Sequence, residues 1–244
     1  MAQLSFDHVM FRTPALVSCG GALITWHHIH VYSFDFLYVF EAALLVWLGY
    51  RFVQPRKHGD LKIERPLLLT ALFVLFGTHG FPCSLVVAGL ILYFYHLPAN
   101  ISLRNIPLIK NISIALAWIC CTTALMFRPT SEFYLVFFAD FLLIFGLSLL
   151  SDIRDRMADQ GQIKTLVHSI GLLPTALLSY VCIAAFLLIH IPFAFNITAL
   201  GTLLTCLVFI APLPIWCSIY KTHRQATIAI DLCLSVLPLI VALV

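Results

Sequence analysis

Three aspartates lie close together in a chain that carries few charges. Asp152, Asp155 and Asp159 follow the long apolar run 135–150 and make up three of the eleven acidic residues in 244. At 100° per residue they fall within an arc of about 60° on one face of a helix. Carboxylates this close repel one another, so they stay ionised at low cost only beside a cation. The pattern favours Mg²⁺ carrying a phosphorylated substrate, and we place the candidate chemistry here.

Most of the remaining sequence is apolar. The chain is 61% hydrophobic, only 10% of its residues are charged, and its mean hydropathy is +1.01. Apolar runs near twenty residues recur along it, and each matches the ~30 Å hydrocarbon core of a bilayer. The composition predicts one integral-membrane domain over 1–244, an all-α polytopic bundle in contact with membrane lipid. The net charge of +3 is confined to short turns and gives no indication of a nucleic-acid partner.

The apolar runs divide into about nine expected transmembrane helices. They are 13–31, 33–52, 66–79, 81–96, 109–127, 132–150, 170–192, 196–218 and 226–244. The third and fourth are short, and one hairpin that only partly crosses is the alternative there. Of the 14 Lys and Arg residues, 13 fall at the N-terminus and in the turns after the even-numbered spans, leaving only Arg128 on the opposite side. The positive-inside rule then predicts a multi-pass protein, of a bacterial inner membrane, with its N-terminus and these turns in the cytoplasm.

Some ionisable residues lie inside or at the outer ends of the expected spans. A charge within a span usually faces a cavity or a partner, so we expect Glu41 and Asp140 to line an intramembrane cavity. Several histidines fall near the expected outer surface: His27, His28, His30, His79 and His190. They favour either a haem or transition-metal site or interfacial residues with no chemical role.

The residues around the aspartates resemble a known motif. The stretch 151–159, Ser-Asp-Ile-Arg-Asp-Arg-Met-Ala-Asp, and then 163–166, Ile-Lys-Thr-Leu, resemble the second aspartate-rich motif of the UbiA superfamily of membrane prenyltransferases. In that family the motif follows the sixth span. The stretch 106–111, Ile-Pro-Leu-Ile-Lys-Asn, with Trp118 further on, resembles the opening of the family's fifth span. The nine expected spans also resemble the family's architecture over most of the chain.

This resemblance implies a Mg²⁺-dependent transferase. Family members bind Mg²⁺ and the diphosphate of a polyprenyl donor between two aspartate-rich turns, after spans two and six. By this resemblance Asp152, Asp155 and Asp159 are metal ligands, and Asp155 and Asp159 are catalytic. The polyprenyl group would pass to a lipophilic acceptor, aromatic or a quinone precursor, with no protein partner expected. Mg²⁺ and basic side chains stabilise the charge on the departing diphosphate, and a lipid-surrounded cavity keeps water from the allylic cation.

The turn after the second span departs from the family's pattern. Phe52 and Arg56 stand where the family's first motif, an Asn-x-x-x-Asp-x-x-x-Asp-like string, has aspartates. A basic turn can instead hold a diphosphate directly. The expected diphosphate contacts are Arg51, Arg56, Lys57, Lys110 and Lys164. The same basic residues also fit simple anchoring at the membrane surface. The missing aspartates equally fit a degenerate member that binds an isoprenoid or quinone without transferring it, or a membrane scaffold.

The expected topology can be tested with reporter fusions. Fusions at Arg56, Arg128 and Val244 should report the cytoplasm, the outside and the outside, because 13 of the 14 basic residues then lie on the cytoplasmic side. A cytoplasmic signal at Val244 would show an even number of spans and contradict the count of nine.

Overall fold

The computed structural model describes residues 24, 37–53, 83–95, 97, 102–126, 130–156, 164–190, 230, 233 and 236–238. Every regular element in these ranges is a helix, and they contain no strand, which confirms an all-α fold for this part of the chain. The elements are α2 (Leu37–Val53), α4 (Cys83–Tyr95), η2 (Leu103–Asn105), α5 (Ile109–Cys121), η3 (Thr123–Met126), α6 (Ser131–Asp155), α7 (Leu166–Ile170) and α8 (Leu172–His190).

Two of the described helices are long and apolar enough to cross a bilayer. These are α6 and α8, each with a mean hydropathy of 2.3 over its most apolar stretch, and α4 and α5 are shorter apolar helices. Leu173 and Val181 on α8 are 70% and 64% exposed, as expected of side chains that face lipid. The helices α2, α4, α5, α6 and α8 coincide with the expected spans two, four, five, six and seven. Spans one, three, eight and most of nine lie outside the described residues, so the count of nine stays a prediction.

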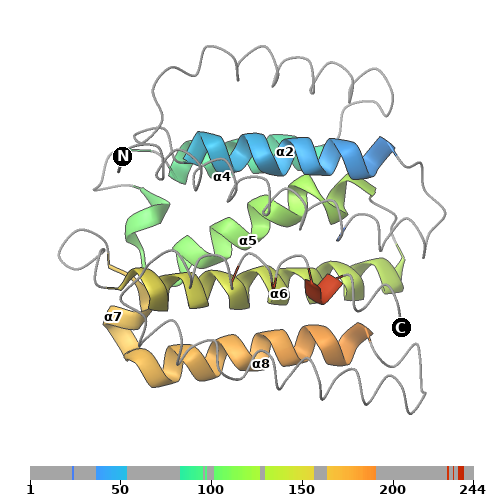
Figure 1. The fold of residues 1–244 in the computed structure, drawn as a ribbon. Helices are drawn as coiled ribbons and strands as arrows, with labels where there is room; N and C mark the ends of the chain where they lie inside the picture. Colours follow the sequence, from blue (N-terminus) through green and yellow to red (C-terminus); the bar gives the residue numbers. More distant parts are fainter. Residues whose placement is uncertain are drawn as a thin grey trace, which may run out of the picture.

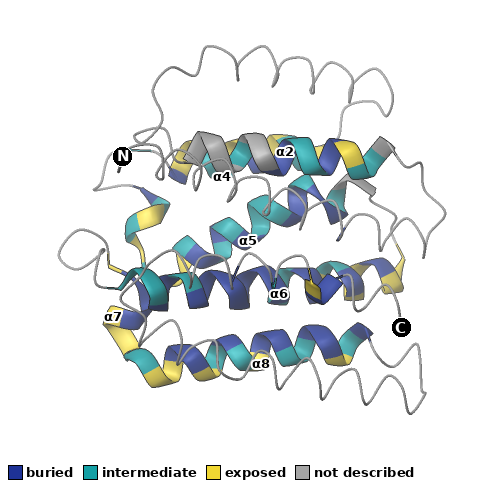
Figure 2. Cartoon of the chain, in the orientation of Figure 1, coloured by how far each residue is buried: buried dark blue, intermediate teal, exposed yellow. Residues whose placement is uncertain are grey.

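The helix α6 lies at the centre of the described bundle. It packs against α5 on one side and α8 on the other (Figure 1). Thr130 begins it as N-cap, its hydroxyl accepting the Phe133 amide at 3.2 Å. Glu132 in the first turn and Arg154 in the last complement the helix dipole. Figure 2 shows buried residues along most of α6, whereas α8 is exposed on the side away from it.

The contact between α6 and α8 depends on one glycine. A Cβ at Gly146 would lie 3.0 Å from Ile183 Cγ1 and 3.1 Å from the Ser179 carbonyl oxygen. The Ser179 hydroxyl donates to the Gly146 carbonyl at 2.8 Å, in a buried position. Small residues at helix crossings let backbones approach closely, which is how helices associate in membranes. Gly146 therefore sets how closely the antiparallel helices α6 and α8 approach.

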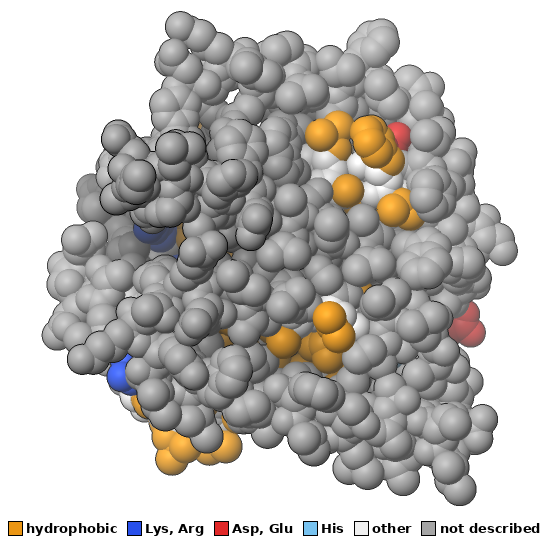
Figure 3. Space-filling view, in the orientation of Figure 1, with side chains coloured by type: hydrophobic (Ala, Val, Ile, Leu, Met, Phe, Trp, Pro, Cys, Tyr) orange, Lys and Arg blue, Asp and Glu red, His pale blue; other side chains and the backbone are white. Residues whose placement is uncertain are grey.

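The described basic side chains gather at one end of the bundle. The Lys and Arg side chains described all belong to the end where α5 begins and α6 ends: Arg104, Lys110, Arg154, Arg156 and Lys164. In Figure 3 the visible basic side chains lie at the end that carries α7 in Figure 1, and visible acidic ones lie at the opposite end. The basic end is the one that the positive-inside rule assigns to the cytoplasm.

Replacing Gly146 with alanine should weaken the α6–α8 contact. The new methyl would meet a backbone carbonyl that cannot turn aside, and such overpacking typically costs about 1–3 kcal/mol of folding free energy. The matched control is Gly89→Ala in α4, where a Cβ meets nothing within 4 Å. Thermal unfolding in detergent should show a lower midpoint for Gly146→Ala and an unchanged or higher one for Gly89→Ala. Equal midpoints for the two variants would contradict the close approach.

Candidate functional site

A strained turn fixes the start of α5. Leu108 has φ +70° and ψ −50°, and the Ile109 amide donates to the Pro107 carbonyl at 2.9 Å. Three residues closed in this way form a γ-turn, whose positive-φ form is rare and costly for a residue with a Cβ. The turn aims the first residues of α5 toward α6, so local strain is stored beside the polar residues Lys110 and Asn111.

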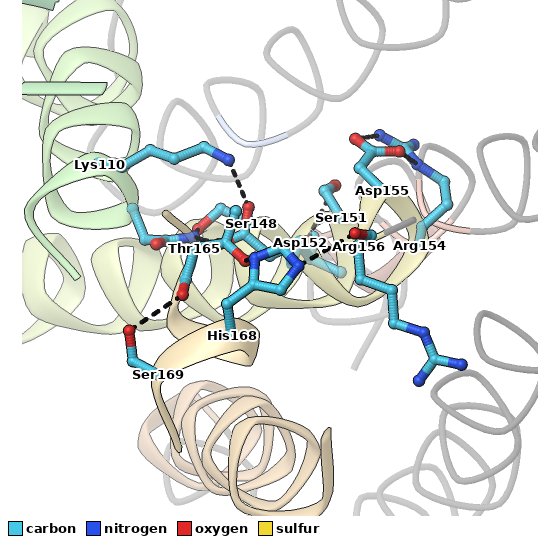
Figure 4. A network of polar contacts seen from close by, with 12 residues as sticks. Lys110, Ser148, Ser151, Asp152, Arg154, Asp155, Arg156, Thr165, His168 and Ser169 are labelled. Carbon is cyan, nitrogen blue, oxygen red and sulfur yellow. Dashed lines mark hydrogen bonds and ion pairs between the residues drawn. The ribbon is translucent and has the colours of Figure 1, made fainter. Parts of the chain in front are cut away.

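Lys110 and Asn111 together engage both oxygens of Asp152 on α6. Lys110 Nζ lies 2.6 Å from Asp152 Oδ1, and Asn111 Nδ2 donates to Oδ2 at 3.1 Å. Figure 4 shows the Lys110 side chain reaching across from α5 to Asp152. Asp152 is only 2% exposed and Asn111 is fully buried. A buried carboxylate needs such partners because an unpaired charge in the interior is very costly.

Asn111 links this ion pair to Ser148, one helical turn before Asp152 on α6. Its Nδ2 also donates to Ser148 Oγ at 3.1 Å, and that hydroxyl donates to the Phe145 carbonyl at 2.8 Å. Within the described residues Asn111 Oδ1 is buried and accepts no hydrogen bond. Such an unsatisfied acceptor costs about 1–3 kcal/mol, so it is a natural contact for a bound water or ligand.

Asp155 sits in a different environment from Asp152. Arg154 Nε and Nη2 each donate to one of its oxygens at 2.7 Å, which makes a two-pronged pair between neighbouring residues. The Asp155 side chain is 26% exposed, against 3% for Asp152. A partly exposed pair of this kind contributes little to stability. Both the Asp155 carboxylate and the Arg154 guanidinium can therefore exchange their present partner for a ligand at small cost.

His168 ties α7 to the end of α6. Its Nε2 lies 3.1 Å from the Arg156 carbonyl oxygen, which can only accept, so Nε2 carries the proton and donates. For a neutral ring, Nδ1 then accepts from the Thr165 hydroxyl at 2.9 Å. Figure 4 shows His168 directed toward the end of α6. This contact holds the start of α7 close to the end of α6.

The structure brings together only some of the residues expected at the site. Lys110 pairs with Asp152 where α5 begins and α6 ends, Asp155 follows at the end of α6 beside Arg154, and Lys164 is exposed just before α7. Asp140 and Glu41 are buried, and their role as cavity residues stays a prediction; Asp140 lies nearer the opposite end of α6 and contacts Thr123 and His190. Asp159, Arg56, Lys57 and the side chain of Arg51 lie outside the described residues, so their roles stay predictions.

Asn111, Ser148 and His168 were not expected as site residues. Asn111 and Ser148 are buried polar residues within apolar helices, and Ser148 lies four residues before Asp152 on α6. The four-residue spacing places Ser148 and Asp152 on one face of α6, and this could have been read from the sequence. His168 gave no such signal, because its role depends on the contact between α7 and the end of α6.

The described carboxylates fit a metal ion unequally. No group of three His, Cys, Asp or Glu side chains in the described part of the chain is arranged to hold one. Both Asp152 oxygens already accept from Lys110 and Asn111, so this geometry favours an anchoring role for Asp152 over metal binding. Asp155 fits better, because it is more exposed and its arginine partner can be exchanged.

Comparison with known proteins finds no relative of this chain. No family model matches the chain, and no similar protein is found among the curated proteins or the solved structures. The functional interpretation therefore depends on the residues and geometry described above.

Removing Lys110 should destabilise the protein strongly. Lys110→Met leaves the buried Asp152 carboxylate without its cation, and breaking a buried pair in this way costs about 3–5 kcal/mol. Adding Asp152→Asn removes the stranded charge, so the double variant should recover most of the loss. The measurement is the free energy of unfolding in a detergent or denaturant titration.

The matched control for this prediction is Arg154→Met. It breaks an ion pair of similar distance that is more exposed, so it should cost less than about 1 kcal/mol. If Lys110→Met is no worse than Arg154→Met, then the buried pair does not hold α5 to α6.

Proposed function

We propose that this protein is a UbiA-type membrane prenyltransferase-like protein that binds a polyprenyl diphosphate where α5 begins and α6 ends. It would transfer the polyprenyl group to a small lipophilic acceptor, aromatic or a quinone precursor. The observation that carries the proposal is that two aspartates three residues apart have different surroundings. Asp152 is locked in a buried ion pair with Lys110, while Asp155 and Arg154 remain partly exposed beside it.

The basic side chains of this end suit a diphosphate. Arg154 holds a carboxylate with two parallel hydrogen bonds, and the same guanidinium geometry fits a phosphate group. Lys164 is exposed two residues before α7. When a diphosphate arrives, Arg154 would turn from Asp155 to the phosphate oxygens, which exchanges one anionic partner for another and releases the Asp155 carboxylate.

The released carboxylate is the best described candidate for Mg²⁺. Asp155, with Asp159, would hold the ion, which would neutralise charge on the diphosphate as the allylic C–O bond breaks. Arg154 would hold the departing diphosphate. The ion pair with Lys110 would keep Asp152 from competing for the metal. The apolar helices that surround this end would solvate the isoprenoid tail and exclude water.

A second candidate function is isoprenoid or quinone binding without transfer. It is favoured by one observation, that each described carboxylate at this end is already paired with a basic side chain of the protein. An arrangement neutralised in this way has no need of a metal ion. Such a protein would retain a lipid whether or not Mg²⁺ is present.

The two candidates differ in their response to Mg²⁺ and to Asp155→Ala. Purified protein in nanodiscs would be assayed for binding of geranylgeranyl diphosphate and for transfer to a panel of hydroxylated aromatic acids, with Mg²⁺ or with EDTA. For the transferase, Asp155→Ala should abolish Mg²⁺-dependent transfer, because losing a metal ligand costs several kcal/mol of transition-state stabilisation. Arg154→Gln should weaken diphosphate binding ten-fold or more, a loss of at least about 1.4 kcal/mol.

The matched control is Glu132→Gln, which removes an exposed acid at the opposite end of α6 and should leave binding and transfer unchanged. Transfer by Asp155→Ala within three-fold of wild type would show that the site is misassigned. Binding that ignores EDTA, with no transfer to any acceptor, would support the second candidate. No binding of the diphosphate by wild type would overturn the transferase, and no retained isoprenoid or quinone in the purified protein would overturn the second candidate.

A further inference from the structure

The side-chain amide of Asn111 has one polar atom that the protein leaves without a partner. Its Nδ2 donates to Ser148 Oγ and to Asp152 Oδ2, each at 3.1 Å, so both amide hydrogens are engaged. In the part of the chain that the structure describes, Oδ1 accepts no hydrogen bond, and Asn111 is fully buried. The side chain therefore combines two engaged donors with one free acceptor.

The neighbours of Asn111 fix which way its amide points. The carboxylate of Asp152, paired with Lys110 at 2.6 Å, can only accept, so the atom that faces it is the amide nitrogen. Ser148 donates its own hydrogen to the Phe145 carbonyl at 2.8 Å, so towards Asn111 it can only accept. Turning the amide over would lose both contacts and bring oxygen against oxygen. Asn111 thus offers a ligand an acceptor and no donor.

The charges beside this acceptor favour a neutral ligand group. Lys110 already neutralises the carboxylate that Asn111 contacts. A cation at Oδ1 would lie near the Lys110 ammonium and be repelled by it, and an anion would meet the negative end of the amide dipole. A neutral hydrogen-bond donor satisfies Oδ1 without adding charge, and it removes the cost of a buried unpaired acceptor. A hydroxyl is the simplest such group.

A row of aromatic rings continues from this polar group along α6. At 100° per residue, positions 138, 141, 145, 148 and 152 fall within an arc of about 80° on one face of the helix. The rings of Phe145 and Phe141 stack with their centroids 5.7 Å apart, and those of Phe141 and Phe138 stack at 6.5 Å. Phe145 is buried, whereas Phe138 is 52% exposed. This aromatic row, Phe138, Phe141 and Phe145, leads from the surface of the bundle to the helical turn before Ser148, and it suits packing by a lipophilic ring.

We propose that Asn111 is a specificity-determining residue that selects a lipophilic ring carrying a free hydroxyl. The ring packs at the inner end of the aromatic row, and its hydroxyl donates to Asn111 Oδ1. A methyl ether or a quinone carbonyl has no hydrogen to donate and would place a second acceptor against Oδ1. The inference deepens the proposed function and rests on it for the presence of a ring at this end of the bundle. Of a quinol and its quinone, the site takes the quinol.

Selection of the hydroxyl can be measured by binding alone. Protein in nanodiscs would be titrated with a panel of one-ring and two-ring phenols and with the methyl ether of each, without diphosphate or Mg²⁺. Empty nanodiscs correct for partition into lipid. Wild type should bind at least one phenol about ten-fold or more tightly than its ether, because the ether leaves Oδ1 unpaired against a second acceptor. Asn111→Leu, which is similar in shape and has no polar atom, should bring the two affinities to within about two-fold of each other.

The matched control is Ser113→Ala, which also removes a buried polar group from α5 but lies about 160° from Asn111 around the helix. It should leave the ratio of the two affinities unchanged. If Asn111→Leu does not fold, Asn111→Ser removes Oδ1 and keeps a hydroxyl that can donate to Asp152, and it should lower the ratio in the same way.

Three results would overturn the proposal. They are wild type that binds neither phenols nor ethers, wild type that binds both equally, and a ratio that persists in the folded Asn111 variants. Equal binding would mean that Oδ1 is met by water only. Because no diphosphate is present, a failure of diphosphate binding would count against the transferase and leave this measurement unchanged. A protein that binds the diphosphate but does not distinguish phenol from ether would overturn this inference alone.

Discussion

The central constraint on this bundle is that α6 carries two buried aspartates, and each must find its polar partners on neighbouring helices. Asp152 finds Lys110 and Asn111 on α5, and Asp140 finds Thr123 and His190 on η3 and α8. An apolar surface alone would let helices rotate or slide against one another, since lipid and side chains are equally apolar. The polar contacts remove that freedom because only one register satisfies both carboxylates.

The first of these anchors also explains how a neighbouring aspartate stays available. Asp152 and Asp155 are three residues apart, yet one is a buried structural partner and the other a partly exposed side chain. The sequence motif that contains both aspartates does not distinguish the buried one from the exposed one. A γ-turn at Leu108 begins α5 two residues before Lys110, the residue that reaches Asp152.

The sequence was sufficient to predict the helical class and the location of five helices, because apolar runs of bilayer length leave few alternatives. It also placed Lys110, Asp152 and Asp155 at the same end of the bundle, but it did not predict that Lys110 pairs with Asp152. It was not sufficient to separate the roles of the two aspartates, since helical periodicity places both on one face and only the position of α5 decides which is buried. The pairing of Asp140 with His190 was likewise beyond reach, because it depends on how far α8 extends along α6.

The two ends of α6 differ in the charge of the described side chains around them. Where α5 begins and α6 ends, the five described basic side chains outnumber the two aspartates Asp152 and Asp155, so this end favours an anion. Near the opposite end Asp140 is buried against the Thr123 hydroxyl and the His190 ring. The two buried aspartates are twelve residues apart on one helix, which corresponds to about 18 Å along its axis. Over that distance the lysine and asparagine that satisfy Asp152 cannot also satisfy Asp140, so each carboxylate depends on a different set of neighbouring helices.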